Sequence, residues 1–240
     1  MEARIVEVLE TIQGEGLFAG ISVVLVRFQG CNLNCIYCDT PEAKNPAPYA
    51  LIESRHGERS IANPISVDDL INLIVEGFPS AKNALITGGE PLLQKEAAAE
   101  LGKGLKHYGF TVHLETNATI EVDRKTLLDS FDFISMDVKL PSSQGGKDLW
   151  SLHKGFIQRI EGLPASIKMV VSPDSIGEAR DALLLISELN RNIPVLIQPV
   201  HIDGKPSVDA RALMDLCRFA QAMLTDVRVS IQTHKVLGLK

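Results

Sequence analysis

Hydrophobic and polar positions along this 240-residue chain form two strand-like runs and then a regular succession of strand and helix patterns. Residues 3–12 alternate with period two, and residues 22–28 are almost continuously β-branched, so each run is expected to be a strand. Between them, the Gln-Gly-Glu-Gly segment at 13–16 predicts a turn-forming loop. Residues 41–64 are polar, contain prolines and lack a clear period, which indicates an inserted surface loop. Partner docking and plain surface are both open interpretations of that loop.

From residue 66 onward the alternation is regular. Ser66, with Asp69 as its capping partner, predicts the start of a helix with an apolar stripe over 67–78. Ser175 with Glu178, and Ser207, are expected to open two later helices. Further strands are expected at 83–87, 111–115, 131–138, 166–171, 193–198 and 226–231. Further helices are expected near 94–108, 123–129, 148–161, 175–190 and 207–223.

About six strand–helix units after residue 20 define an α/β protein. The strands are continuous apolar runs, as in sheets that are covered on both faces. An open or closed barrel is the natural interpretation, and a doubly wound sheet is the competing one. No linker interrupts the pattern, so residues 1–240 are expected to form one domain. In either architecture, the chemistry is expected at the carboxyl ends of the strands.

Composition narrows the functional class. Hydrophobic residues make up 45% and charged residues 22%, which is ordinary for a soluble globular protein. The net charge is -6 and no Lys/Arg stripe occurs, so nucleic acid is not an expected partner. No apolar run approaches the length of a membrane span. The first ten residues, MEARIVEVLE, lack the form of a secretory signal, so a cytoplasmic location is expected.

Three of the four cysteines cluster directly after the strand at 22–28. Cys31, Cys35 and Cys38 form a C-x3-C-x2-C array, whereas Cys217 falls in a helical pattern and is expected in the core. A structural zinc site uses four protein ligands, whereas three thiolates on a 4Fe-4S cluster leave one iron open for a small molecule. A Cys3His zinc site remains an alternative, with its fourth ligand among His113, His201 and His234.

This array, with Tyr37 before the third cysteine, resembles the signature of the radical S-adenosylmethionine superfamily. The resemblance implies a partial or modified (β/α)6 barrel with an extra N-terminal strand. It also implies a 4Fe-4S cluster whose open iron binds the amino and carboxylate groups of S-adenosylmethionine. One electron then cleaves the sulfonium and produces a radical that abstracts hydrogen. No catalytic residue is implied beyond that cofactor radical.

Later strand ends match further superfamily motifs. Residues 88–91 (Gly-Gly-Glu-Pro) look like its GGEP motif, and residues 115–117 (Glu-Thr-Asn) resemble its ETNG motif, with Ala118 in place of glycine. By themselves, residues 88–91 could be a glycine-rich turn, and Asp137 with Lys139 a surface pair. The resemblance implies S-adenosylmethionine contacts from Tyr37, Cys38, Asp39, Gly88, Gly89, Glu90, Thr116, Asn117, Asp137, Val138, Lys139 and Gln198.

Other segments are similar to the 7-carboxy-7-deazaguanine synthases. These are the loop at 13–16, Arg27, the Asp-Thr pair after Cys38, and the Gln-Thr-His-Lys run at 232–235. The implied substrate is 6-carboxy-5,6,7,8-tetrahydropterin, whose ring contracts with loss of ammonia in 7-deazapurine (queuosine or archaeosine) biosynthesis. The resemblance implies that S-adenosylmethionine is regenerated, Mg²⁺ assists, the protein is a homodimer, and a flavodoxin- or ferredoxin-like protein donates electrons.

The same resemblance implies a set of substrate and metal contacts. Arg27 is the only charge in its strand and suits a carboxylate, although pairing with a carboxylate of the chain is equally open. Thr40 offers the oxygen ligand that Mg²⁺ prefers. The implied substrate contacts are Ile12, Gln13, Gly14, Glu15, Arg27, Thr87, His234 and Lys240.

Two other functions remain open at this point. A radical activase that acts on a partner protein would share the cysteine array but would not need Arg27 or the loop at 13–16. A zinc-stapled barrel that only binds a partner would not need residues 88–91. Such a protein would be colourless.

Overall fold

Parallel strands form the centre of the sheet in this computed structural model, which describes residues 1–202 and 204–239. The sheet order is β14-β11-β10-β9-β8-β7-β3-β2-β4-β5. All neighbours from β3 to β14 pair in parallel. Their bounds are β3 Ser22–Phe28, β7 Asn83–Gly88, β8 Thr111–Thr116, β9 Phe133–Val138, β10 Ala165–Val171, β11 Val195–Pro199 and β14 Val227–Val229.

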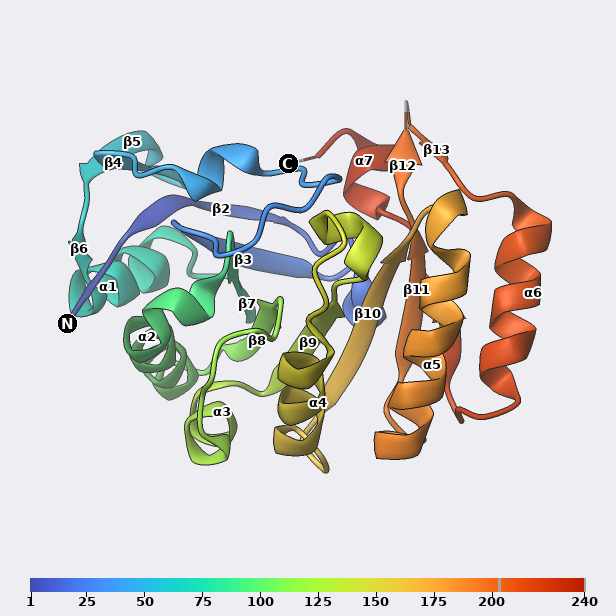
Figure 1. The fold of residues 1–240 in the computed structure, drawn as a ribbon. Helices are drawn as coiled ribbons and strands as arrows, with labels where there is room; N and C mark the ends of the chain where they lie inside the picture. Colours follow the sequence, from blue (N-terminus) through green and yellow to red (C-terminus); the bar gives the residue numbers. More distant parts are fainter. Residues whose placement is uncertain (203, 240) are drawn as a thin grey trace.

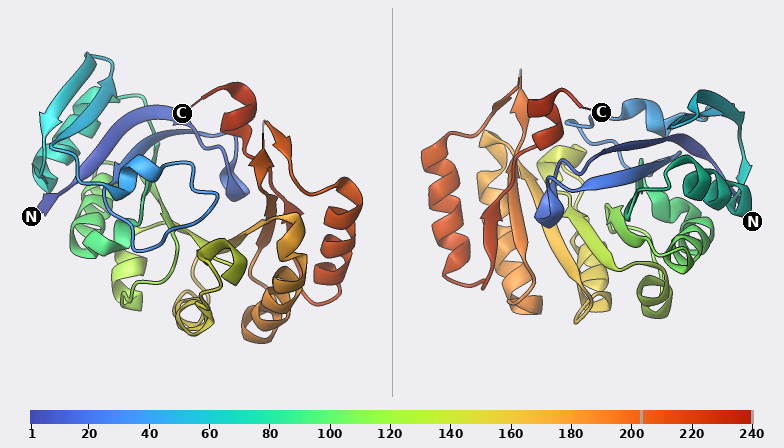
Figure 2. Two further views of the ribbon diagram at one scale, coloured as in Figure 1. Left: turned by 45° about the horizontal axis from the view of Figure 1, so that its top comes forward. Right: turned by 180° about the vertical axis from the view of Figure 1, so that it is seen from behind.

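Helices connect these strands and cover the convex outer face of the curved sheet (Figures 1 and 2). They are α1 Val67–Gly77, α2 Lys95–His107, α3 Arg124–Ser130, α4 Trp150–Arg159, α5 Ile176–Asn190 and α6 Ala210–Gln221. Because these helices lie on one face, the sheet is of the barrel type and not doubly wound. β14 and β5 are the two edges of the sheet, so its hydrogen bonds leave the barrel open.

Strand alternation separates the two faces of the sheet. In β3, Val24, Val26 and Phe28 join the large core under the helices. Val23 and Leu25 point the other way and join a small apolar cluster with Leu9 and Leu85. Because successive side chains of a strand point to opposite faces, every second residue of each parallel strand faces the hollow of the barrel.

An extra N-terminal strand was expected, and the structure confirms it. β2 (Ile5–Ile12) pairs antiparallel with β3. The prediction of a loop at 41–64 is wrong, because this segment holds the short helix η2 (Pro41–Lys44) and a hairpin of β4 (Tyr49–Ser54) and β5 (Gly57–Ala62). β4 pairs with β2 and extends the sheet. β5 is an exposed edge strand, so its polar sequence carried no hydrophobic period.

α5 (Ile176–Asn190) begins after Ser175 as predicted but lacks the expected cap, and the start of α6 differs from expectation. Ser175 does not cap α5, because its hydroxyl instead accepts a hydrogen bond from the Ser172 amide at 2.8 Å in the short helix η5 (Pro173–Ser175). Glu178 accepts hydrogen bonds from the Ser142 amide and hydroxyl, at 3.0 and 2.8 Å. The cap of α6 is Asp209, not Ser207.

The remaining expectations about local structure are met. Ser66 accepts a hydrogen bond from the Asp69 amide at the start of α1, as predicted. Cys217 is buried in the core beneath α6. Smaller pairs of strands complete the fold: β1 (Glu2–Ala3) with β6 (Ile65–Ser66), and β12 (His201–Ile202) with β13 (Lys205–Pro206).

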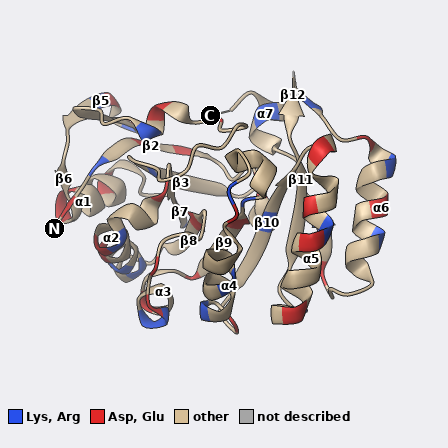
Figure 3. Cartoon of the chain, viewed as in Figure 1, with Lys and Arg blue, Asp and Glu red and all other residues tan. Residues whose placement is uncertain are grey.

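None of the helices in the described residues is long and apolar enough to cross a lipid bilayer. Acidic and basic residues are interspersed over the visible helices (Figure 3).

Candidate active site

A cavity of ≈ 1470 Å³ opens at the carboxyl ends of the parallel strands. It exceeds the roughly 300–1,000 Å³ that one small ligand usually fills, so it has room for a cofactor and a substrate together. Six successive strands, β3 to β11, each place at least one polar side chain on its wall. In chain order these include Arg27, Thr87, Glu115, Asp137, Lys168 and Gln198. Arg27 and Lys168 lie at inward positions, because the residues on either side of them belong to the core.

The cysteine loop borders one end of this cavity. Cys31, Cys35 and Cys38 are all partly exposed and line it. Gly30 starts the loop with a φ of +92°, a conformation that favours glycine. Burial raises the pKa of the Cys31 thiol, so a bound cation is needed to hold it as a thiolate at neutral pH.

The spread of the thiols distinguishes between an iron–sulfur cluster and zinc. Zinc with Zn–S bonds of about 2.3 Å would hold tetrahedral thiolates within about 4 Å of one another. In the described residues, the one group of three possible ligands whose atoms lie within 4.8 Å of one another is Glu15, Asp39 and His234, without a cysteine. The three thiols are therefore too far apart to share a zinc ion. They suit a wider cluster that keeps one iron free of protein ligands.

Gly88 and Gly89 bring the end of β7 against the cysteine loop. A Cβ on Gly88 would lie 2.5 Å from the Phe28 nitrogen, and a Cβ on Gly89 would clash with the Gly30 carbonyl oxygen. The Glu90 amide donates to that same oxygen at 2.8 Å. Both glycines, which the resemblance implied as S-adenosylmethionine contacts, border the cavity and also pack against the backbone of the chain itself.

Glu90 is fully buried behind the cavity wall. Its carboxylate accepts hydrogen bonds from the Leu92 amide at 2.9 Å, the Thr116 hydroxyl at 2.8 Å and the Asn117 amide at 2.7 Å. Burial raises the pKa of Glu90 to about 7, although these donors favour the charged form. Glu90 thus joins the ends of β7 and β8. The next residue of the β8 loop, Ala118, adopts the left-handed conformation with a φ of +57° even though it is not glycine.

The loop after β2 supplies further polar groups to the cavity wall, and its Glu15 lies near Asp39, which follows Cys38. Gln13 donates to Glu115 at 2.9 Å, and the Thr87 hydroxyl donates to the same carboxylate at 3.1 Å. Glu15 contacts Lys168 and accepts from the Gln232 amide at 2.7 Å. Burial would raise the pKa of Glu15, but the charge and hydrogen bond of Lys168, together with Gln232 and His234, outweigh it and lower the pKa to about 2. Glu15 is therefore a carboxylate at neutral pH.

The C-terminal segment lies against this loop. The short helix α7 (Thr233–Leu237) begins where the Thr233 amide donates to the Gly14 carbonyl oxygen at 2.8 Å. The His234 ring occupies the space that a side chain at Gly14 would need. This contact places His234 and Gly14 together on the cavity wall. Lys240 lies outside the described residues.

Arg27 faces the cavity and is paired with Glu7 of β2, with Nε 2.7 Å from Oε1. Pairing with a carboxylate of the chain and binding of a ligand carboxylate are thus compatible. The ion pair with Glu7 engages Nε of Arg27 and leaves the terminal nitrogens to a ligand carboxylate.

Asp137 and Lys139 form a half-buried ion pair at 2.8 Å, and not a surface pair. The Lys139 ammonium lies 5.2 Å from the centre of the Tyr37 ring, which ties the end of β9 to the cysteine loop. In the described structure, Oδ1 of Asp137 and Oε1 of Gln198 are buried without a hydrogen-bond partner. Both residues border the cavity, so these two oxygens are acceptors that a ligand can satisfy.

Comparison with known proteins identifies the family. Residues 25–217 match the radical SAM superfamily. The 7-carboxy-7-deazaguanine synthase of Geobacter sulfurreducens is 37% identical over 250 residues, covering 98% of this chain and 97% of that protein. That of Methanopyrus kandleri is 34% identical, covering 98% and 93%. The chain belongs to the 7-carboxy-7-deazaguanine synthase family of radical S-adenosylmethionine enzymes.

A solved structure supports the fold of this synthase. The crystal structure of QueE from Escherichia coli matches 98% of this chain and 95% of its own with a TM-score of 0.67, at 24% identity. The resemblance drawn from the motifs is therefore confirmed at the level of family and fold. The comparisons favour the synthase over the activase and over a zinc-stapled binding module.

The structure of this synthase brings most of the expected site residues to one cavity. Val138 points into the core, Glu90 lies behind the wall, and Lys240 is outside the described residues. All others border the cavity, including Ile12, Asp39, Thr40, Gly88, Thr116 and Asn117.

Sequence reasoning missed several residues of the site. Lys168 is the only charge in the run 166–171, the same signal that singled out Arg27. Glu115 was noted only as part of a motif. Gln232 was likewise noted only as part of a motif, and Gln144 carries no local signal, because it reaches the site through a distant contact.

Proposed function

We propose that this chain converts 6-carboxy-5,6,7,8-tetrahydropterin to 7-carboxy-7-deazaguanine, with loss of ammonia and with S-adenosylmethionine regenerated in each cycle. The observation that carries the proposal is one cavity that is bordered by three partly exposed thiols and by an arginine among hydrogen-bonding side chains. The names of the full-length relatives support the same reaction.

Cys31, Cys35 and Cys38 would hold the 4Fe-4S cluster. When bound, the cluster and S-adenosylmethionine supply the radical that takes hydrogen from the substrate. The unpartnered oxygens of Asp137 and Gln198 would accept hydrogen bonds from the nucleoside and amino groups of S-adenosylmethionine. The superfamily resemblance adds Tyr37, Asp39, Asn117 and their neighbours to these contacts.

Arg27 would bind the substrate carboxylate through its terminal nitrogens. Glu15, fixed as a carboxylate, would accept hydrogen bonds from N–H groups at the pterin edge. Thr87 and Gln13 reach the same region from β7 and the β2 loop. His234 closes the wall from α7, and we propose that Lys240 is a further substrate contact.

Mg²⁺ would bind at Thr40, which follows the cysteine loop and borders the cavity. Thr40→Ala is expected to weaken the stimulation of turnover by Mg²⁺, whereas Thr111→Ala, at an exposed position of β8, is expected to keep it. Equal stimulation in both variants would remove Thr40 from the Mg²⁺ site.

The proposed reaction also needs an electron from a partner protein. A flavodoxin- or ferredoxin-like donor would deliver this electron. Ile36, within the cysteine loop, has 76% of its surface exposed and offers a place near the cluster for such a protein. We further propose that the enzyme is a cytoplasmic homodimer.

The deciding experiment is an anaerobic assay with reconstituted protein, S-adenosylmethionine, Mg²⁺, a reductant and 6-carboxytetrahydropterin. Mass spectrometry is expected to detect 7-carboxy-7-deazaguanine without a matching loss of S-adenosylmethionine. Cys31→Ala is expected to abolish both cluster and product, while Cys217→Ala, a core cysteine, keeps both. Steady release of 5′-deoxyadenosine without product would keep the radical chemistry and reject this substrate.

A further inference from the structure

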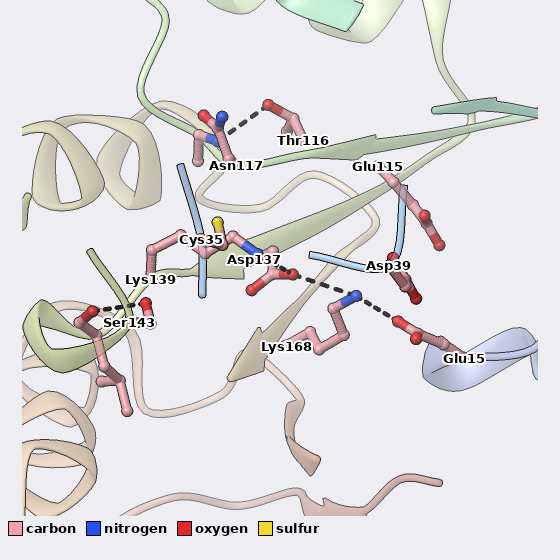
Figure 4. Close-up of polar contacts among 12 residues, drawn as sticks. Glu15, Cys35, Asp39, Glu115, Thr116, Asn117, Asp137, Lys139, Ser143 and Lys168 are labelled. Atoms are coloured by element: carbon pink, nitrogen blue, oxygen red, sulfur yellow. Dashed lines mark hydrogen bonds and ion pairs between the residues drawn. The ribbon is translucent and has the colours of Figure 1, made fainter. Parts of the chain in front are cut away.

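Lys168 links the loop after β2 to the end of strand β9 on the cavity wall. Its ammonium contacts the Glu15 carboxylate on one side and lies 3.2 Å from Oδ2 of Asp137 on the other. Figure 4 shows Lys168 between these two carboxylates. Glu15 comes from the loop after β2, whereas Asp137 ends strand β9 beside the cysteine loop.

The three side chains form a buried, continuous array. Side-chain exposure is 12% for Lys168, 12% for Glu15 and 14% for Asp137. Lys139 contributes a second cation to Asp137, at 2.8 Å from Oδ2. Asp137 therefore directs Oδ2 to two lysines, while its Oδ1 is buried without a hydrogen-bond partner. On the other side, Gln232 engages Oε1 of Glu15, and Lys168 contacts Oε2.

Strand register explains why Lys168 can make both contacts. Lys168 and Asp137 are paired neighbours on β10 and β9, so their side chains leave the same face side by side. The long lysine side chain then reaches across to the β2 loop, 153 residues away in the sequence.

We propose that Lys168 is a positioning residue that holds Glu15 and Asp137 in one shared arrangement, so that S-adenosylmethionine and the pterin bind cooperatively. This inference rests on the proposed function. A ligand that donates a hydrogen bond to Oδ1 of Asp137 orders one end of the array. Because Lys168 is common to both ends, the second ligand then meets a Glu15 that is already ordered, and it loses less conformational freedom on binding. By thermodynamic linkage, each ligand must increase the affinity of the protein for the other ligand by the same factor.

Without Lys168, the direct link between Glu15 and Asp137 is lost, while Gln232 still joins Glu15 to Asp39. Glu15 would keep Gln232, and Asp137 would keep Lys139, so each ligand would still find its own contacts. What would be lost is the shared cation that makes the position of one carboxylate depend on the other. Loss of Lys168 is therefore expected to reduce the coupling between the ligands more than it reduces binding of either ligand alone.

The test is anaerobic titration calorimetry on the cluster-loaded protein without reductant, so that no turnover occurs. The dissociation constant of S-adenosylmethionine is measured with and without saturating 6-carboxytetrahydropterin. In the wild type, the pterin is expected to lower this constant at least about fivefold, the lower range of typical coupling. Lys168→Met is expected to bring the ratio of the dissociation constants without and with pterin close to one. Lys168→Arg, which keeps the cation, is expected to restore most of the wild-type ratio. Lys125→Met removes an exposed lysine on α3 and is expected to match the wild type.

Equal ratios for Lys168→Met and the wild type, or a wild-type ratio of one, would overturn the inference. If Lys168→Met fails to load its cluster, Lys168→Gln and Lys168→Arg carry the comparison. A retained ratio in the glutamine variant, or a ratio of one in the arginine variant, would also overturn it. Failure of the proposed function is distinguishable, because the wild type would then neither bind nor convert the pterin, whatever residue stands at 168.

Discussion

The side-chain amide of Gln144 donates a hydrogen bond to Sγ of Cys35 at 2.9 Å. Gln144 ends the short helix η4 (Pro141–Gln144), and the preceding residue, Ser143, accepts from the Ile36 amide at 3.2 Å. The loop after β9 thus holds the cysteine loop by two hydrogen bonds. Donors to a ligating sulfur stabilise the reduced, more negative form of an iron–sulfur cluster.

Gln144→Leu is therefore expected to shift the midpoint potential of the bound cluster to more negative values. The measurement is a redox titration of the reconstituted protein followed by electron paramagnetic resonance. Gln158→Leu changes an exposed glutamine on α4 and serves as the control. An unchanged potential in Gln144→Leu would show that the hydrogen bond is lost once the cluster is bound.

Gly89→Ala is expected to prevent cluster assembly. The new methyl group would meet the Gly30 carbonyl oxygen and lie 2.9 Å from Cβ of Cys31, so the cysteine loop would have to move. Overpacking of this kind typically costs about 1–3 kcal/mol. Iron content and absorbance after anaerobic reconstitution are the readouts. Gly155→Ala on α4, where a Cβ has open space, is expected to load normally, and equal loading by both variants would contradict the prediction.

Arg27→Lys is expected to weaken binding of the pterin substrate. Glu7 fixes the guanidinium through Nε, and a lysine cannot keep that contact and also present two nitrogens to a carboxylate. We expect KM for the pterin to rise about tenfold or more, equivalent to about 1.5–3 kcal/mol for a lost charge-assisted contact. Affinity for S-adenosylmethionine is expected to stay unchanged and is the internal control. Steady-state kinetics and calorimetry measure the two effects, and a normal KM would exclude Arg27 from the substrate site.

His153 is expected to make the fold sensitive to acid. Its Nε2 donates to the Asn117 carbonyl oxygen at 3.2 Å, and burial lowers its pKa to about 4 despite that hydrogen bond. Between this value and the ordinary pKa of about 6.5, the unfolded chain binds more protons than the folded one. The contribution to stability is therefore present above pH 6.5 and is lost as the pH falls toward 4.

This contribution amounts to about 2 kcal/mol between pH 7 and pH 5. His153→Gln keeps a donor for the Asn117 carbonyl oxygen but does not titrate. Urea unfolding at the two pH values should give the variant a smaller loss of stability than the wild type by about that amount. Equal losses would mean that His153 titrates normally in the folded protein.

Local pattern was sufficient for much of this fold. The run 22–28 predicted β3, and its alternation also placed Arg27 on the face opposite Val26 and Phe28. Ser66 predicted the start of α1 because a cap is satisfied within three residues. The cysteine array indicated a bound cofactor because all three thiols lie on one short loop.

Where the sequence pattern failed, the deciding partner was distant. Ser175 has the residues of a helix cap around it, yet Glu178 binds Ser142 of another loop. The polar strand β5 forms because β4 lies beside it, and β4 in turn pairs with β2. Edge strands that face water leave no hydrophobic period in the sequence.

By itself, the sequence determined most of the order of strands and helices, the strand ends that carry most of the polar site residues, and the cysteine chemistry. Periods of 2 and 3.6 residues encode the face on which a side chain lies, and that is a local property. The tertiary structure alone decided which inward side chains meet. Lys168 finds Glu15, and Gln144 finds Cys35, because the sheet curves and brings separate loops over one cavity. That curvature depends on the pairing and packing of all the strands, and no single segment of the chain specifies it.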